Sequence, residues 1–314
     1  MNIQVETGKF PSSAGTTDIV YTRWFDRDVA PRSSFLIAHG MSEYMARYDD
    51  FARFLVSHGF AVYGNDHLGH GKTARTPDDR GFFADREGYL RVMDDLHTLV
   101  GRARADFPGL PVLLLGHSMG SFVARVFCMR HSEEIHGAIF MGTGGANPLS
   151  SLGYFVLAME SLLHGERYRS GLFHALSLGA YSAAIKDRKT NLDWLSTDGD
   201  AVRKYRDDEL CGFRFTVSAS RDLLRMLDEC TRPGWAASVR SDLPVLVISG
   251  GDDPVGAAGK GVRETFRDLQ DAGVKDAELI LYENMRHEIL NEQDKKRVYS
   301  DILDWCKRKG REHP

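Results

Sequence analysis

The sequence predicts an α/β fold in which a mostly parallel central sheet carries helices on both faces. Short runs that are apolar throughout recur along the chain, which is typical of strands buried on both faces. Amphipathic stretches separate these runs, as the crossover helices of a parallel sheet do. The 314 residues, of which 42% are hydrophobic, suffice for one large domain or two small ones.

The first half of the chain predicts strands and helices in alternation. Phe51, Phe54 and Leu55 recur at helical spacing before Gly59, which indicates a helix that ends at this glycine. A Gly-rich loop, residues 65–72, follows the apolar run at 60–63. We expect strands at 19–25, 35–38, 60–63, 112–115 and 135–141, and helices at 48–58, 90–100 and 118–130.

The pattern changes after about residue 142. Helices are expected at 152–163, 172–186 and 220–230, without a convincing buried strand between them, and the charged segment 203–209 is interpreted as a solvated face. Strands at 245–248 and 278–282 and helices at 262–271 and 294–309 then resume the α/β pattern. We therefore expect a core of residues 1–145 and 236–314, with residues 146–235 forming a helical cap inserted after the strand at 135–141.

Composition excludes several classes of function. Lys and Arg total 40 and Asp and Glu total 44, a net charge of −4 that does not favour a nucleic-acid partner. The four cysteines form no CxxC pair, so we expect free thiols in a reducing compartment. The N-terminus lacks the features of a signal peptide, and the apolar runs are shorter than the roughly 18 residues of a membrane span. A cytoplasmic location is expected.

The segment 116–120, GHSMG, matches the G-x-S-x-G pattern around Ser118. An apolar strand precedes it and a helical segment follows, which is the setting that a nucleophile elbow requires. Side chains two residues from the serine would collide in so sharp a turn, and glycines stand there. The alternative is a Gly-rich turn with an incidental serine.

A serine nucleophile needs a histidine base and an acid that orients it. The chain order Ser, acid, His that accompanies this elbow leaves two of the twelve histidines, His287 and the penultimate residue His313. We favour His287, because it follows the strand at 278–282 by a short loop. Asp252 and Asp253 both follow the strand at 245–248; we favour Asp253, since Pro254-Val255 after it suits an acid loop, and Asp252 stays open.

An oxyanion hole needs two backbone N–H groups aimed at the developing charge. The residue after the nucleophile, Met119, is expected to supply one, and Met41 in the loop after the strand at 35–38 the other. Gly40 lets that loop turn in closely. Asp66, His67 and His70 could supply metal ligands, but we expect their loop to be structural and predict neither a metal nor a cofactor.

Five stretches share the pattern of one family: HGMSEYMARY (39–48), NDHLGHGKT (65–73), GHSMG (116–120), GGDDPV (250–255) and RHEILNE (286–292). The chain resembles the monoacylglycerol lipase and lysophospholipase group of serine α/β-hydrolases. The resemblance implies the α/β-hydrolase fold, with Ser118, Asp253 and His287 as the triad. It also implies that Glu43 and Arg47 shape the alcohol-side end of the site, and we count Gly40, Glu43, Arg47 and His117 as the substrate-binding residues.

The expected function is hydrolysis of a small-molecule acyl ester, of the monoacylglycerol or lysophospholipid kind, through an acyl-enzyme. Acyl thioesterase, small-ester carboxylesterase, a peptidase of the proline-iminopeptidase type and a non-catalytic ligand receptor are the alternatives. The apolar segment 152–163 is expected to cover the serine and to suit an acyl chain. Transient membrane contact through the cap and the oligomeric state are left open.

Overall fold

The central sheet has eight strands in the order β1-β2-β4-β3-β5-β6-β7-β8. The computed structural model describes residues 1–309, and His313 lies outside the described residues. From β4 to β8 every neighbouring pair is parallel, whereas β1 and β2 join antiparallel at one edge. The strands are β1 (Ile3–Pro11), β2 (Asp18–Asp26), β3 (Ser33–Ala38), β4 (Phe60–Asn65), β5 (Val112–His117), β6 (Gly137–Met141), β7 (Val245–Gly250) and β8 (Ala277–Tyr282).

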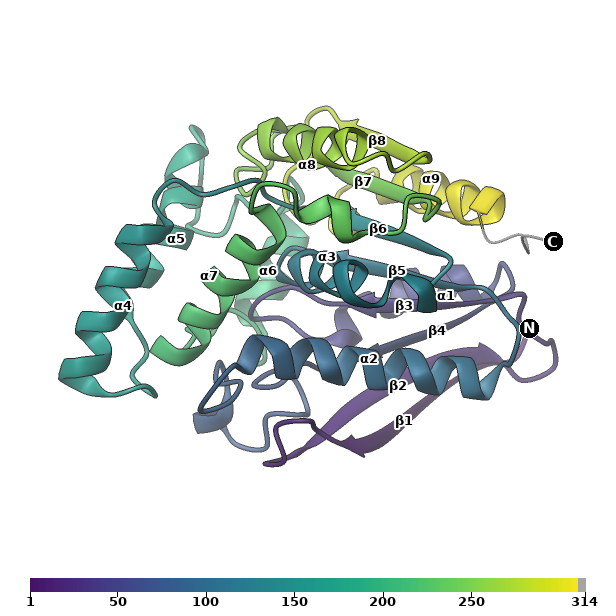
Figure 1. The fold of residues 1–314 in the computed structure, drawn as a ribbon, viewed down its shortest axis with the longest axis horizontal. Helices are drawn as coiled ribbons and strands as arrows, with labels where there is room; N and C mark the ends of the chain where they lie inside the picture. The colour runs from purple at the N-terminus through teal and green to yellow at the C-terminus, as the bar shows by residue number, and fades with distance from the viewer. Residues whose placement is uncertain (310–314) are drawn as a thin grey trace.

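Helices cover both faces of the sheet, which confirms the predicted fold class (Figure 1). Alternate residues of the central strands enter opposite cores: Leu36 and Leu114 pack with α2 and α3, whereas Phe35 and Leu113 pack with α1 and α9. The helices are α1 (Asp49–Val56), α2 (Gly88–Asp106), α3 (Met119–His131), α4 (Ser150–His164), α5 (Gly171–Ala184), α6 (Gly199–Asp207), α7 (Val217–Thr231), α8 (Lys260–Asp271) and α9 (Lys295–Lys309).

Two elements were not expected from the sequence. The strand β1 lies at the sheet edge and is only partly buried, so it lacks the continuous apolar run of the central strands. The helix α6 occupies the charged segment interpreted as a solvated face. Most of its residues are exposed, but Val202 and Tyr205 are buried on one side. The prediction of a solvated face was therefore wrong for Tyr205.

The chain between β6 and β7 contains α4, α5, α6 and α7. Within the described residues, the β-pairing there is a single isolated bridge between Arg169 and Thr216. Figure 1 shows α4 and α5 projecting beyond one end of the sheet, with α7 between them and the core. The helix α7 packs against α2, α3 and α4. Interpretation of residues 146–235 as a separate cap stays a prediction. None of the described helices combines the length and the apolar character needed to cross a bilayer.

A fully buried arginine in α3 holds both ends of this insertion. The Arg125 guanidinium donates to the carbonyl of Gly144 at 3.0 Å, where the chain leaves β6, and to the carbonyl of Cys230 at the end of α7. It also lies 4.2 Å from the centre of the Trp235 ring. One side chain thus joins the exit and the return of the inserted segment to the helix that follows Ser118.

We predict that Arg125→Ala lowers the free energy of unfolding by about 3 kcal/mol, because it empties a buried site and leaves two buried carbonyls without a donor. Urea denaturation measures the change. The matched control is Arg130→Ala on the same helix, whose half-exposed guanidinium pairs with Glu229 and should contribute less than about 1 kcal/mol. Equal effects of the two substitutions would contradict the anchoring role of Arg125.

Candidate active site

Ser118 stands at the turn between β5 and α3 in a strained backbone conformation, φ 54° and ψ −120°. Its N–H donates to the carbonyl of Met141 on the neighbouring strand at 2.9 Å. A Cβ atom on Gly116 would overlap the carbonyl of Gly120, and one on Gly120 would overlap the carbonyl of Ala38. Both glycines of the motif are therefore required for this turn, as a nucleophile elbow demands.

His287 lies in the loop after β8, and its Nδ1 atom is 2.9 Å from Oδ2 of Asp253. The buried Asp253 carboxylate also accepts hydrogen bonds from the Ser249 hydroxyl at 3.1 Å and the Val255 N–H at 2.9 Å. Asp252 is exposed instead, and its N–H donates to the carbonyl of Met285. Of the two aspartates that the sequence left open, Asp253 is the one that contacts the histidine.

The environment of His287 sets its protonation. Its ring is buried between those of His117 and Trp194, whose centres lie 4.9 and 5.1 Å away. Burial disfavours the charged imidazolium, but the adjacent Asp253 carboxylate outweighs it, so the pKa of His287 is raised above its usual value. Because Nδ1 faces a carboxylate, the proton of the neutral ring belongs on Nδ1 and leaves Nε2 free to accept one.

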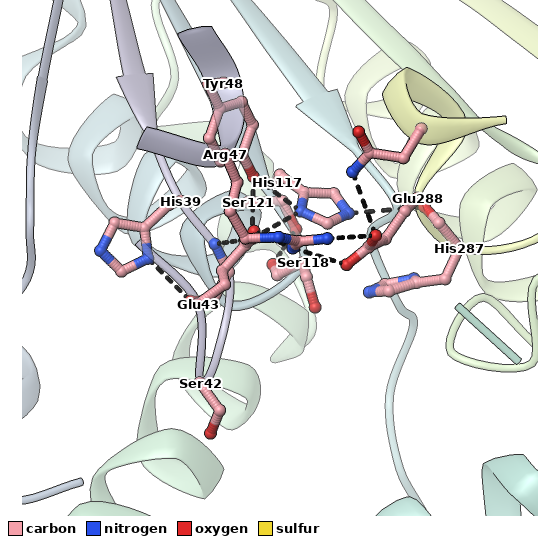
Figure 2. Close-up of polar contacts among 12 residues, drawn as sticks. His39, Ser42, Glu43, Arg47, Tyr48, His117, Ser118, Ser121, His287 and Glu288 are labelled. Atoms are coloured by element: carbon pink, nitrogen blue, oxygen red, sulfur yellow. Dashed lines mark hydrogen bonds and ion pairs between the residues drawn. The ribbon is translucent and has the colours of Figure 1, made fainter. Parts of the chain in front are cut away.

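Ser118 and His287 line a single cavity of about 460 Å³. Both side chains are drawn in Figure 2. Of the other residues predicted for the site, Gly40, Met41, Glu43, His117 and Met119 also line it. Much of the remaining wall is apolar or aromatic, with Phe122, Leu178, Tyr181, Leu192, Trp194, Leu195, Phe213, Leu223 and Val255. The cavity is large enough for a small ligand and is walled mainly by apolar groups, as ligand pockets usually are.

Both residues of the predicted oxyanion hole, Met41 and Met119, line this cavity. Met119 is the first residue of α3, so its N–H has no acceptor within the helix. Met41 lies between Gly40 and Ser42, and Ser42 has a positive φ of 54°. The role of both amides as oxyanion donors stays a prediction.

Buried histidines hold the Gly40–Ser42 loop. The Ser42 N–H donates to Nε2 of His70 at 3.1 Å, and Nδ1 of His39 lies 2.8 Å from the carbonyl of Gly40. Burial lowers the pKa of His39 and lowers that of His70 to about 3, so both rings are neutral at pH 7. The loop 66–70, which we considered for metal binding, thus supports the backbone near Met41 through His70.

Of the other two residues considered for a metal, Asp66 accepts the N–H groups of Met45 and Lys72 with its carboxylate oxygens, and Nδ1 of His67 lies 3.3 Å from the Asn65 amide nitrogen. A separate group of potential ligands among the described residues is His97, His131 and Glu134. Its two rings stack at 4.1 Å with 18° between their planes, and Glu134 lies 2.7 Å from His97 Nε2. Parallel rings cannot both direct a nitrogen at one ion in their planes, so this geometry is that of a hydrogen-bonded cluster.

Glu43 joins the polar groups at one end of the cavity (Figure 2). It accepts the Gly40 N–H at 2.6 Å and the Tyr48 hydroxyl at 2.8 Å, and His117 Nδ1 lies 3.0 Å away. Burial alone would raise the pKa of Glu43, but the charge of Arg47 and the contact with His117 bring it well below its usual value. Glu43 is therefore ionised.

Arg47 does not line the cavity, although the sequence grouped it with the substrate-binding residues. Its guanidinium instead bridges Glu43 and Glu288. Sequence reasoning missed Glu288 and Tyr48, together with Trp194 of the insertion. Two of the three carried a signal, since Glu288 directly follows His287 and Tyr48 closes the H-G-x-x-E-x-x-x-R-Y pattern.

The expectation that the apolar segment 152–163 covers the serine was wrong. No described residue of α4 lines the cavity, whereas α5 contributes Ala175, Leu178 and Tyr181. The helix α4 packs through Leu157 against α7, which leaves Phe155 64% and Leu162 81% exposed. A helix that is apolar on most sides does not reveal from sequence which side it buries.

Known proteins similar to this chain are hydrolases. The family model Hydrolase_4, with the description serine aminopeptidase S33, matches residues 29–294. A monoacylglycerol lipase of Mycolicibacterium smegmatis is 28% identical, over 94% of this chain and 94% of that protein. Phospholipase YtpA of Bacillus subtilis is 26% identical, over 88% of this chain and 95% of that protein. A solved thermostable carboxyl esterase from Bacillus coagulans, in complex with glycerol, is 28% identical with a TM-score of 0.91, covering 98% of this chain and 99% of that chain.

Proposed function

Because this chain belongs to the Hydrolase_4 family and has the α/β-hydrolase fold, we propose that it is a serine carboxylic ester hydrolase acting on a monoacylglycerol or lysophospholipid-like acyl ester. One observation carries the proposal: the Asp253–His287 pair and the strained Ser118 meet at one largely apolar cavity. The lipase and phospholipase relatives support the substrate class.

In the proposed reaction, Ser118 Oγ attacks the acyl carbonyl while Nε2 of His287 takes the hydroxyl proton. Asp253 holds the ring through Nδ1 and stabilises the imidazolium that forms. The N–H groups of Met41 and Met119 donate to the tetrahedral oxyanion. The imidazolium then protonates the leaving alcohol, and a water molecule activated by His287 hydrolyses the acyl-enzyme. No cofactor enters these steps.

The family description names an aminopeptidase, but the cavity favours an ester over an N-terminal peptide. A free amino group needs an unpaired carboxylate to bind it. Among the described residues that line the cavity, the carboxylates are Glu43 and Glu288, and both already pair with Arg47. Acyl thioesterase and small-ester carboxylesterase activity use the same groups, and a panel of esters and thioesters of one acyl chain separates them.

We further propose that the exposed apolar side of α4 and α5 touches a membrane or lipid surface transiently. Exposed side chains gather on these two helices and the segment between them: Leu152, Phe155, Met159, Leu162, Leu163, Tyr168, Leu172 and Leu176. So many exposed large apolar side chains on two neighbouring helices suit contact with an interface that delivers an acyl chain. The adjoining α5 also lines the cavity.

The substitution Ser118→Ala should reduce hydrolysis of a short p-nitrophenyl ester by at least about 10⁴-fold, because it removes the attacking oxygen. Circular dichroism and the melting temperature should match those of the unmodified protein. Turnover that persists in a folded Ser118→Ala protein would exclude the proposed mechanism.

The pH dependence of kcat/KM should follow His287, which acts as a base only when neutral. Since Asp253 raises the pKa of His287, activity should fall as the pH drops through a value above the usual 6.5 or so of histidine. In Asp253→Asn this acid limb should move to lower pH and kcat should fall on the order of 10³- to 10⁴-fold. The exposed neighbour provides the control: Asp252→Asn should change neither quantity, and an equal effect would contradict the assignment of Asp253.

Membrane contact is tested by flotation with phosphatidylcholine vesicles. The double substitution Phe155→Ser and Leu162→Ser should weaken vesicle binding at least about tenfold, since it removes two large apolar side chains from the surface. Val29→Ser serves as the control, because Val29 is 59% exposed and lies in the loop before the start of β3, at the other end of the sheet. Binding that is unaffected by the double substitution would argue against the proposed contact.

A further inference from the structure

We infer that Arg47 is a positioning residue that clamps the loop of the predicted oxyanion hole to the loop of His287. Its guanidinium bridges Glu43, three residues after Gly40, and Glu288, the residue after His287 (Figure 2). The inference rests on the proposed function and adds a role to it: Arg47 acts on the reaction through two carboxylates rather than by touching the substrate.

The first arm of the clamp reaches the Gly40–Ser42 loop. Nη1 of Arg47 donates to Oε2 of Glu43 at 2.6 Å. The other oxygen of Glu43 accepts the Gly40 N–H at 2.6 Å. This hydrogen bond holds the backbone directly before Met41. Tyr48, which follows Arg47, donates its hydroxyl to the same oxygen at 2.8 Å.

The second arm reaches the histidine loop. Nη1 and Nη2 of Arg47 donate to the two oxygens of Glu288 at 2.8 and 2.7 Å, a bidentate pair between residues 241 positions apart. Glu288 is itself fixed, because its N–H donates to the Leu195 carbonyl at 2.7 Å and its Oε2 accepts from Asn291 at 3.1 Å. The orientation of the peptide that carries His287 is thereby tied to Arg47.

The charges and burial explain why the residue is an arginine. The side chains of Glu43 and Glu288 are 4% exposed and that of Arg47 is 12% exposed. Two buried carboxylates need a cation, and the planar fork of a guanidinium can serve both at once, whereas a lysine ammonium is a single point charge. Tyr205 of α6 covers the guanidinium at 4.8 Å from its ring centre.

The clamp matters because catalysis requires precise positions of the catalytic groups. The oxyanion donors and the histidine come from opposite parts of the chain, yet both must be held within a fraction of an ångström relative to Ser118. A buried ion pair contributes little net stability on average, because desolvation offsets the attraction. We therefore expect the effect of the clamp to appear in the chemical step more than in folding.

The test compares Arg47→Lys with the unmodified protein on p-nitrophenyl butyrate, a small neutral ester. Lysine keeps the charge and loses the bidentate fork. We expect kcat and the rate of fluorophosphonate labelling of Ser118 to fall about 10- to 100-fold, with KM changed less than about threefold. The surface control is Arg53→Lys in α1, whose guanidinium is 45% exposed and pairs with Asp49, and it should have no effect.

A substitution cycle separates the clamp from a general loss of structure. Arg47→Met leaves two buried carboxylates without their cation, so it should be less active than Arg47→Lys. Adding Glu288→Gln removes one of these unpaired charges. Relative to Arg47→Met, the double variant should recover melting temperature without recovering kcat. Recovery of kcat together with the melting temperature would mean that Arg47 matters for stability alone.

Two results with Arg47→Lys also overturn the inference: a kcat within about twofold of the unmodified protein, or a KM that rises at unchanged kcat. The second result would make Arg47 a substrate-binding residue. Failure of the proposed function is distinguishable, because it would appear as hydrolysis that survives Ser118→Ala. If Ser118→Ala is inactive and Arg47→Lys is fully active, the clamp alone is refuted.

Discussion

The site depends on how closely three backbone segments approach one another around Ser118. The end of β3, the turn after β5 and the first turn of α3 meet where Gly116 and Gly120 leave no room for a Cβ atom. This contact accompanies the strained conformation of Ser118, and Met119, the first residue of α3, lines the cavity beside it. It also brings the Gly40–Ser42 loop, at the end of β3, beside the serine. The other groups are arranged around this fixed point.

Two buried arginines fix the relative positions of chain segments, which apolar packing alone does not. Arg125 joins the elbow helix to both ends of the inserted segment through backbone carbonyls, and Arg47 links Glu43 with Glu288, which both line the cavity. A guanidinium can satisfy several acceptors in one plane, so each of them fixes the relative position of segments that are distant in sequence. Apolar packing is non-directional and would leave such loops a range of positions.

The parts of the molecule that sequence reasoning could predict are those with a local physical signature. Doubly buried strands such as β5 are apolar over residues 112–115, the G-x-S-x-G pattern singled out Ser118, and chain order with the position after a strand favoured His287. The edge strand β1 and the charged helix α6 lacked such a signature. The positions of Glu288 and Trp194 in the site follow from tertiary contacts. The choice between Asp252 and Asp253 required knowing which side chain is buried. The outward side of α4 was unpredictable because that helix is apolar nearly all round.

The central claim is that Ser118 becomes acylated. The most direct measurement is mass spectrometry of the protein quenched within milliseconds of mixing with a p-nitrophenyl ester, followed by peptide mapping. The account predicts that the peptide containing Ser118 gains the mass of the acyl group less the one hydrogen it replaces, at the rate of the p-nitrophenol burst. Complete hydrolysis with no acylated peptide at any quench time, or acylation of a different residue, would contradict it.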